Sequence, residues 1–554
     1  MGVPLVHGFR LDHLRGDLYG GLTAAVVALP LALAFGVASG AGPMAGVYGA
    51  ILVGLFAALL GGTPSQVSGP TGPMTVVMAA LLVEFAHQPA IAFTVVVMSG
   101  LLQMLFGWLK LGRYITYIPY SVISGFMSGI GLIIILLQLA PLVGHATSEQ
   151  GVIHALTNLS HQFSQISWQA ALLGLLGLGI MLFTPGAIRR YLPSPLLALL
   201  ICTPVAMALG WQIPTIGEIP QGLPTLHPPH FSLELLPNMI QWAITLALLG
   251  SIDSLLTSLV ADNFTRTEHN ADRELIGQGV GNMVAGLFGA IPGAGATMRT
   301  VVNIRAGGRT PISGALHALI LLGLMLGLAP LAESIPHAVL AGILIKVGWD
   351  IIDWDHLKRL YTAPRAEGVV TLTVLLLTVI ADLVTAVGVG IVMVSLISAK
   401  QMSEQQLNQL NLFASDGEHT PLAPEHLALL SQAQGRILLL HLSGPFSFCS
   451  AKDMVRKMGS IGANYRVVVL DLEEVTMIDT SIALVFEELI QRCQESGREV
   501  VLICGGSCSI NGVVETLDGL GIMAKLTPAN CHPIRKQGLK HALKLADIVS
   551  CSEE

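Results

Sequence analysis

Charged side chains are scarce in this chain of 554 residues: they make up 11% of it, whereas hydrophobic residues make up 53%. A soluble domain carries about 25% charged residues. Apolar runs of about 20 residues, the length that crosses a hydrocarbon layer, recur from about Gly20 to about Ala399. The scarcity of charge therefore excludes one large soluble core and indicates a membrane protein.

Basic patches, paired cysteines and enzyme motifs are also missing. The net charge is −7 without a basic patch, so we do not expect a nucleic acid as a partner. Six of the seven cysteines lie after residue 448 without a CxxC pair, which favours reduced thiols over a metal site. The spans hold no pair of catalytic acids, and no GxGxxG or P-loop stands in a convincing context, so we predict neither an enzyme nor a bound cofactor. The first 17 residues lack the apolar region of a signal peptide.

Fourteen apolar segments are candidate spans. They cover residues 17–37, 43–62, 70–85, 91–108, 116–141, 168–185, 194–210, 238–260, 273–290, 296–304, 312–330, 337–349, 367–383 and 385–400. Lysine and arginine occur only in alternate connections between them, for example at Lys110, Arg189 and Arg266. Because basic loops stay in the cytoplasm, this pattern predicts a protein of the cytoplasmic membrane with both termini in the cytoplasm.

Two short phrases repeat one pattern, in which glycine and proline interrupt an apolar chain and a threonine follows. They are SGPTGPMTVV near residue 70 and PGAGATMRTVV near residue 296. The spans from Gly20 and from Ile244 stand at nearly the same offset, about 225 residues. Seven spans are an odd number, so a duplicated half enters the membrane from the opposite side. The sequence therefore predicts a 7+7 inverted repeat, with halves at about 17–210 and 238–400.

The two interrupted phrases are candidates for an anion pocket. Non-helical backbone is tolerated in a bilayer only where protein or a water-filled cavity surrounds it. Each phrase leads into a short helix, whose positive end attracts an anion. We predict that Thr71, Thr297 and the exposed amides of Gly295 and Ala296 bind it. The alternative is that these glycines and prolines only kink or pack helices.

Two charged residues sharpen this prediction. Asp253 lies in an otherwise apolar run, where a charge costs about 2.5 to 3.5 kcal/mol. Thr257 is on the same helix face, and such oxygens suit sodium; the alternative is that Asp253 accepts a proton. Arg299 follows the second phrase and stays charged. It could bind the anion, pair with Asp253 in place of a coupling cation, or extend to the cytoplasmic surface.

The last part of the chain differs in composition. We predict a transport domain over 1–400, a linker over 401–432 and a soluble cytoplasmic domain over 433–554, because charged residues become frequent there and apolar runs shorten to strand length. Strand signals begin at Gly435, Tyr465 and Arg498, and a helix signal begins at Ser481. This alternation predicts a small α/β domain with a mixed sheet.

Several blocks of the sequence resemble the sulfate permease (SulP) family of anion transporters, and most closely its cyanobacterial sodium-dependent bicarbonate transporters. The blocks are RGDLYGGLTAAVVALPLALAFGVASGAG, PTGPMTVVM, PYSVISGFMSGIG, LLTSLVADNFTRTEHNADRELIGQGVGNM and GAGATMRTVVNIRAGGRTPISG. The resemblance implies core and gate domains, a homodimer and an elevator-like movement of the core. It also implies a sodium site at Asp253, Thr257, Gly295 and Thr297, and a bicarbonate site at Thr71, Ala296 and Thr297.

Arg299 departs from the pattern of those bicarbonate transporters, which have a small residue there, whereas many other family members have arginine. Sulfate, chloride or a carboxylate anion therefore remains a candidate substrate, and a proton remains a candidate coupling ion beside sodium. The tail resembles a STAS domain, in whose bacterial relatives a serine at the position of Ser481 is phosphorylated. Asp479 and Thr480 are the more natural helix caps.

The sequence thus predicts a secondary active anion transporter, with bicarbonate as the first candidate and sulfate as the second. An exchanger of chloride for bicarbonate is an alternative within the same fold, as is an anion channel. A signalling protein with the STAS domain as its output is an alternative of another class.

Overall fold

The computed structural model describes residues 7–8, 10, 12–115, 119–145, 151–158, 166–189, 192–217, 224–362, 364–381, 383–413, 422–459, 465–505 and 512–551. Parts of two predicted spans and of the predicted linker lie outside the described residues: residues 116–118, residue 382 and residues 414–421. Residue 363 also lies outside them. The chain forms two compact units, Met1–Val392 and Met393–Glu554.

Helices make up almost all of the regular structure in the described part of the first unit. They are α1 (Leu14–Ala38), α2 (Pro43–Leu60), α3 (Gly72–Glu84), α4 (Pro89–Trp108), α5 (Gly112–Ile115), α6 (Tyr120–Leu142), α7 (Gly151–Thr157), α9 (Trp168–Phe183), α10 (Gly186–Arg189), α11 (Ser194–Ala208), α12 (Leu236–Thr265), α13 (Ala271–Leu287), α14 (Thr297–Ala306), α15 (Pro311–Ala332), α16 (His337–Ile351), α17 (Trp354–Arg359) and α18 (Arg365–Ile380). Helix α19 (Leu383–Asn408) continues into the second unit. Two strands, β1 (Ser68–Gly69) and β2 (Ala294–Gly295), have two residues each.

Every predicted span coincides with one of these helices. Among the described helices, six are long and apolar enough to cross a membrane: α1, α2, α4, α6, α12 and α19. Helices α14 and α15 form a seventh candidate that is bent by 110°. The remaining matches are shorter, so the count of fourteen crossings stays a prediction.

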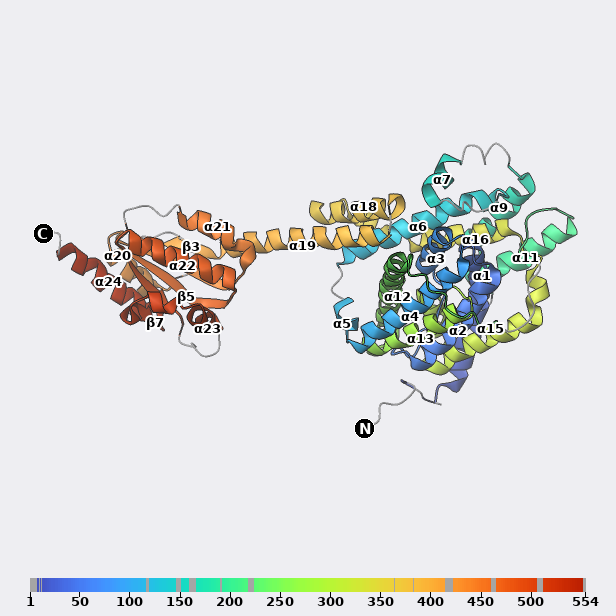
Figure 1. The fold of residues 1–554 in the computed structure, drawn as a ribbon, viewed down its shortest axis with the longest axis horizontal. Helices are drawn as coiled ribbons and strands as arrows, with labels where there is room; N and C mark the ends of the chain where they lie inside the picture. The colour runs from blue at the N-terminus through green and yellow to red at the C-terminus, as the bar shows by residue number, and fades with distance from the viewer. Residues whose placement is uncertain are drawn as a thin grey trace. The chain divides into compact units, whose positions relative to one another are not determined.

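Helices from the two halves of the chain interleave in the first unit (Figure 1). The blue helices α1–α4 pack against the green helices α12–α15, with α4 on α13, α2 on α13 and α1 on α15. We call these eight helices the core domain. Helices α6, α9, α11, α16 and α18 form a second group through contacts of α16 with α6 and α9, and we call it the gate domain.

Paired glycines allow the closest helix contacts in both domains. A Cβ atom on Gly100 would lie 2.5 Å from the carbonyl oxygen of Gly279, and one on Gly279 would lie 2.6 Å from that of Gly100. Gly131 of α6 and Gly348 of α16 face each other in the same way, at 2.5 Å and 2.7 Å. Small residues let membrane helices approach this closely, so a larger side chain at these positions would push the helices apart.

The second unit is a five-stranded mixed sheet covered by helices. The strand order is β3-β4-β5-β6-β7, with β3 antiparallel to β4 and all other pairs parallel. Its elements are β3 (Leu410–Phe413), α20 (Pro424–Gln432), β4 (Ile437–Phe446), α21 (Phe448–Gly459), β5 (Val467–Ile478), α22 (Thr480–Glu495), β6 (Glu499–Ile503), α23 (Val513–Gly519), two short 3-10 turns (Met523–Lys525 and Pro528–Asn530), β7 (Cys531–His532) and α24 (Arg535–Cys551). The predicted mixed sheet is confirmed.

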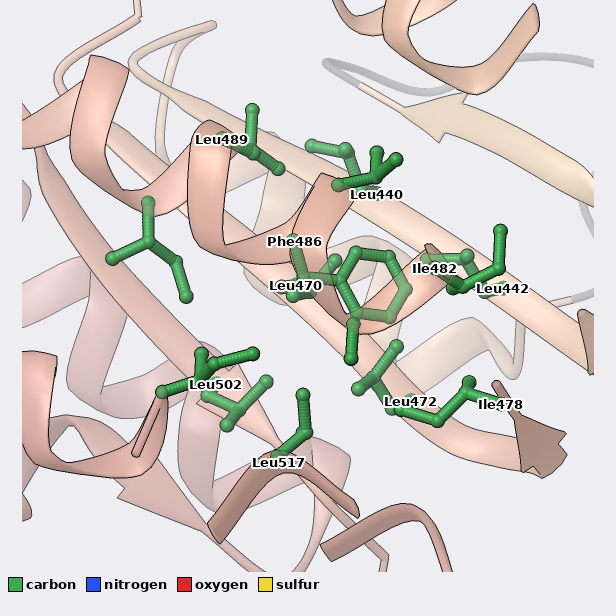
Figure 2. Packing of buried hydrophobic residues seen from close by; sticks show 14 of the residues in the cluster. Leu440, Leu442, Leu470, Leu472, Ile478, Ile482, Phe486, Leu489, Leu502 and Leu517 are labelled. Carbon is green, nitrogen blue, oxygen red and sulfur yellow. The ribbon is translucent and has the colours of Figure 1, made fainter. Parts of the chain in front are cut away.

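Alternate residues of the central strand β5 enter two different cores. Leu470 and Leu472 pack beneath Phe486 of α22, as Figure 2 shows. Val467 and Val469 belong to a second cluster on the opposite face, together with Leu539 of α24. A parallel strand that is buried on both faces has a continuous apolar sequence rather than an alternating one.

Candidate functional site

The two repeated phrases meet in the core domain. Ser68 pairs with Gly295 and Gly69 pairs with Ala294, so β1 and β2 form a short antiparallel ladder. Thr71 and Ala296 are the residues that precede helices α3 and α14. Because the two strands are antiparallel, the helices leave the ladder in opposite directions and both begin beside it. The positive ends of both helix dipoles therefore lie at the ladder.

Helix α12 supplies polar side chains to both helix starts. Asp253 Oδ2 accepts a hydrogen bond of 2.8 Å from Thr71 Oγ1, before α3. One turn further along α12, Thr257 Oγ1 donates to the Gly295 carbonyl oxygen at 2.9 Å and lies 2.8 Å from Thr297 Oγ1. Asp253 is 7% exposed and Thr257 is fully buried. One face of α12 thus joins the two broken segments.

The two backbone amides that we predicted to be exposed are already hydrogen-bonded. The Gly295 amide donates to Ser254 Oγ at 3.0 Å, and the Ala296 amide donates to the Val67 carbonyl oxygen at 3.0 Å. The prediction of exposed amides at these two positions is therefore wrong. Helix geometry leaves the amides of the first turn of α14, from Thr297 to Arg299, without an intrahelical partner. An anion at this helix end would meet those amides instead.

Arg299 points into the protein rather than toward a membrane surface. Its side chain is 2% exposed, and Nη2 donates to the Pro70 carbonyl oxygen at 2.5 Å. The alternative that it extends to the cytoplasmic surface is therefore wrong. Among the described residues it forms no ion pair within 4.0 Å of Asp253, although the two charges act on each other electrostatically. Arg299 links α14 to the residue before Thr71 and brings a positive charge to both helix starts.

The oxygen atoms predicted for a coupling cation are only partly assembled. The hydroxyls of Thr257 and Thr297 and the Gly295 carbonyl lie together, whereas the Asp253 carboxylate is hydrogen-bonded to Thr71. Oxygen ligands of this kind suit a hard cation such as sodium. The described residues contain no group of three or more His, Cys, Asp or Glu side chains that could hold a transition metal.

The helix starts face different surroundings. A Cβ atom on Gly72, the first residue of α3, would lie 2.7 Å from Ile351 Cδ1 and 2.8 Å from Ile134 Cδ1, so the gate domain covers this end with isoleucine. At the start of α14, Thr297 is exposed and Met298 is 61% exposed. The described arrangement therefore opens at the start of α14 and is closed by apolar side chains at the start of α3.

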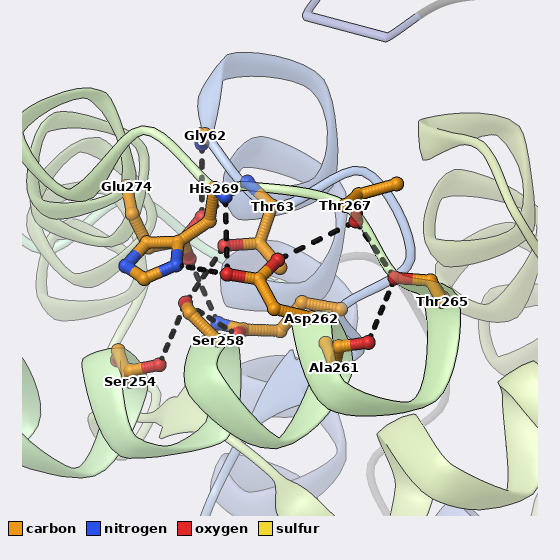
Figure 3. Close-up of polar contacts among 11 residues, drawn as sticks. Gly62, Thr63, Ser254, Ser258, Ala261, Asp262, Thr265, Thr267, His269 and Glu274 are labelled. Carbon is orange, nitrogen blue, oxygen red and sulfur yellow. Dashed lines mark hydrogen bonds and ion pairs between the residues drawn. The ribbon is translucent and has the colours of Figure 1, made fainter.

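A second polar network, which sequence analysis missed, anchors the chain before β1 (Figure 3). Glu274 of α13 is 1% exposed and accepts hydrogen bonds from the amides of Gly62 and Thr63 at 2.9 Å. Side-chain amides of Gln66 and Gln278 also donate to it, both at 2.8 Å. The spacing of Glu274 and Gln278 by four residues in an apolar helix was the available signal. Its other partners, Gly62, Thr63 and Gln66, lie more than 200 positions away, so the sequence alone did not show them.

Part of this network reaches α12. Ser258 Oγ lies 2.7 Å from Thr63 Oγ1 and donates to Gln66 Oε1 at 3.0 Å. Ser258 is one turn from Ser254, which accepts the Gly295 amide. The Glu274 network is thereby continuous with the contacts that hold β2.

In the second unit, Asp479 rather than Thr480 caps α22. Asp479 Oδ1 accepts a hydrogen bond of 3.0 Å from the Ile482 amide, and Thr480 is the first residue of the helix. Ser481 is half-buried in the first turn.

A cluster of opposite charges, buried except for Glu474, also lies in this unit. Arg535 donates to Asp471 and Glu474, both at 2.7 Å, and His441 Nδ1 lies 2.8 Å from Asp471 Oδ2. Burial alone would lower the pKa of the Arg535 guanidinium, but the neighbouring carboxylates raise that pKa above its usual value. This cluster joins β4 and β5 to the start of α24.

Comparisons with known proteins place most of the chain in two families. The model of the sulfate permease family matches residues 14–374, and the model of the STAS domain matches residues 428–515. Two relatives named "Bicarbonate transporter BicA" are each 45% identical to this chain. The match to that of Picosynechococcus sp. covers 98% of this chain and 97% of the relative. The match to that of Synechocystis sp. covers 98% and 96%.

More distant relatives and solved structures agree with this placement. A putative sulfate transporter of Bacillus subtilis, YvdB, is 29% identical over 90% of this chain and 92% of its own length. The solved transmembrane domain of a cyanobacterial bicarbonate transporter, BicA, is 51% identical, with a TM-score of 0.66 over 69% of this chain and all of that chain. The anion transporter SLC26A9 is 18% identical, with a TM-score of 0.81 over 98% of this chain and 92% of that one, and shows the shared fold.

Proposed function

Because the chain belongs to the sulfate permease family and ends in a STAS domain, we propose that it is a secondary active transporter of bicarbonate in the cytoplasmic membrane. The observation that carries this proposal is the 45% identity to bicarbonate transporters over nearly the whole of both chains. The predicted topology has both termini in the cytoplasm, and the resemblance to the family favours a homodimer.

The anion binds where helices α3 and α14 begin. Thr71 and Thr297 contribute hydroxyl groups, which turn their hydrogens from Asp253 and Thr257 to the anion when it binds. The first turn of α14 contributes amides, and Arg299 contributes a positive charge. Gly295 and Ala296 hold β2 in place rather than donating to the anion. The Arg299 guanidinium is buried, so little solvent screens its charge from an anion at these helix starts.

Asp253 takes the coupling ion in this mechanism. Sodium would bind between its carboxylate and the oxygens of Thr257, Gly295 and Thr297; a proton would bind to the carboxylate itself. Movement of the core domain past the gate domain then carries both solutes, as the elevator mechanism of the family implies. Ser481 remains a candidate phosphorylation site in the tail.

Proton-coupled transport of sulfate is the second candidate function. Arg299 favours it, because its charge stands close to Asp253 and reduces the need for a sodium ion. The putative sulfate transporter YvdB of Bacillus subtilis also matches most of the chain.

Uptake of radiolabelled bicarbonate and sulfate into liposomes containing the purified full chain separates these candidates. Bicarbonate uptake that rises with an inward sodium gradient supports the first function. Sulfate uptake that follows a proton gradient supports the second. Uptake that ignores both gradients contradicts symport and favours a channel.

A further inference from the structure

The side chain of one glutamine in the gate domain makes no hydrogen bond within the described part of the chain. Gln138 of α6 is 5% exposed, and no hydrogen bond joins its amide to a described residue. The side-chain amide keeps contact with solvent, because it is not one of the fully buried polar groups that lack a partner in the described part of the chain. An amide that keeps this contact within an apolar helix is available to bind a ligand.

Gln138 borders a small cavity between the core and gate domains. The cavity measures about 20 Å³, which is room for about one water molecule. Its lining from the core domain includes Thr75 and Val76 of α3, and its lining from the gate domain includes Ile134 and Leu344. Gln138 thus faces the helix whose start belongs to the anion site.

Gln138 lies one helical turn beyond the residue that now faces the anion site. Ile134 Cδ1 is 2.8 Å from the position of a Cβ atom on Gly72. Residues four apart share one face of a helix, so Ile134 and Gln138 form a row along α6 that faces α3. On α3, Gly72 and Val76 form the matching row, and Val76 lies at the level of Gln138.

A slide of one helical turn, about 5.4 Å, would therefore bring the start of α3 from Ile134 to Gln138. The movement would be toward Leu142, the end of α6 that the predicted topology places outside. The wall of the anion site would change from an isoleucine to an amide.

We propose that Gln138 is a specificity-determining residue, which binds the anion when the core domain is in its outward position. This inference rests on the proposed function. The amide of glutamine has an NH₂ donor and a carbonyl acceptor side by side. Bicarbonate has a negatively charged oxygen and an O–H group, so it can accept one hydrogen bond from Gln138 and donate another to it. Sulfate and chloride have no hydrogen to donate, and the amide oxygen would face their negative charge.

Transport measured separately from each side tests this inference. The full chain is expressed with Gln138→Met, which keeps an unbranched side chain without the amide, or with Gln138→Asn, which keeps the amide. KM for labelled bicarbonate is measured in right-side-out and inside-out membrane vesicles. We expect Gln138→Met to raise the outer KM about tenfold, equal to about 1.4 kcal/mol, and to leave the inner KM unchanged. Gln138→Asn restores part of the affinity, and inhibition by external sulfate does not change.

Leu139→Met is the matched control, because it places the same side chain at the next position of α6 and leaves Gln138 intact. An unchanged outer KM in Gln138→Met, beside active wild-type transport, overturns this inference and leaves the proposed function standing. An equal rise of KM on both sides also overturns it, because a general structural effect would act in that way. Absence of bicarbonate transport by the wild-type chain overturns the proposed function itself.

Discussion

Replacement of Arg299 by methionine tests the positive charge that the structure places at both helix starts. The guanidinium is 2% exposed, so little water screens its charge, and it donates to the Pro70 carbonyl oxygen beside Thr71. Methionine has a similar length and no charge. Arg299→Met therefore removes the charge and the contact with Pro70 and leaves Thr71 and Thr297 in the chain.

The expected loss follows from the energy of a hydrogen bond to a charged group, about 1.5 to 3 kcal/mol. Since each 1.4 kcal/mol corresponds to a factor of ten, KM for the anion should rise roughly 10- to 150-fold. Removal of the charge near Asp253 should also increase the dependence of uptake on sodium. Arg299→Lys keeps the charge without the planar fork, so its KM should fall between those of the wild type and Arg299→Met.

The assay is uptake of labelled bicarbonate and of labelled sulfate into liposomes, each with and without sodium. Arg305→Met is the control, because Arg305 lies on the same helix with its side chain over the ring of Phe264, 5.6 Å from the centroid. We expect this control to leave KM unchanged. If Arg299→Met transports with the wild-type KM and the wild-type response to sodium, Arg299 has no part in the site.

Three further predictions concern single contacts. Asp253→Asn should abolish accumulation against a gradient while exchange of labelled for unlabelled anion continues; accumulation by the variant would show that Asp253 does not take the coupling ion. Glu274→Ala leaves the amides of Gly62 and Thr63 without their acceptor, at about 1 to 3 kcal/mol for each buried group, so it should lower the unfolding temperature in detergent more than Glu274→Gln does; equal temperatures would contradict this role. Lys536 donates a hydrogen bond of 2.6 Å to exposed Glu425 and thereby lowers the pKa of this carboxyl group. The small stabilisation of the fold by this hydrogen bond should therefore be complete above the ordinary carboxyl pKa, and it should be lost as the pH falls through the lowered pKa of Glu425. Hydrogen exchange of α20 should show this acid dependence in the full chain and not in a Lys536→Met variant.

Local patterns in the sequence predicted the helices well, because apolar runs of membrane length have few alternative structures. The same holds for the interruptions near residues 70 and 296, since glycine and proline break a helix wherever it lies. Asp253 was identifiable for a similar reason: a charge in an apolar run has few explanations. The strands of the tail followed from short β-branched and leucine-rich runs.

Contacts between distant segments could not be predicted from the sequence alone. The Gly295 and Ala296 amides were predicted to be free, but Ser254 and Val67 accept their hydrogen bonds, and this depends on how β1 meets β2. Glu274 was overlooked because its acceptor role depends on the chain around Gly62, 212 positions away. The direction of the Arg299 side chain likewise depends on Pro70, from the other half of the chain.

Chemical labelling of a cysteine at position 297 tests the location of the anion most directly. Thr297 is exposed at the start of α14, so Thr297→Cys in the full chain should react with a charged thiol reagent, and mass spectrometry separates this site from the native cysteines. We predict that bicarbonate slows the reaction with a half-maximal concentration equal to its KM for transport, and that the effect is lost in Arg299→Met. A labelling rate that saturating bicarbonate and sulfate leave unchanged, in a variant that still transports, would contradict an anion site between the two helix ends.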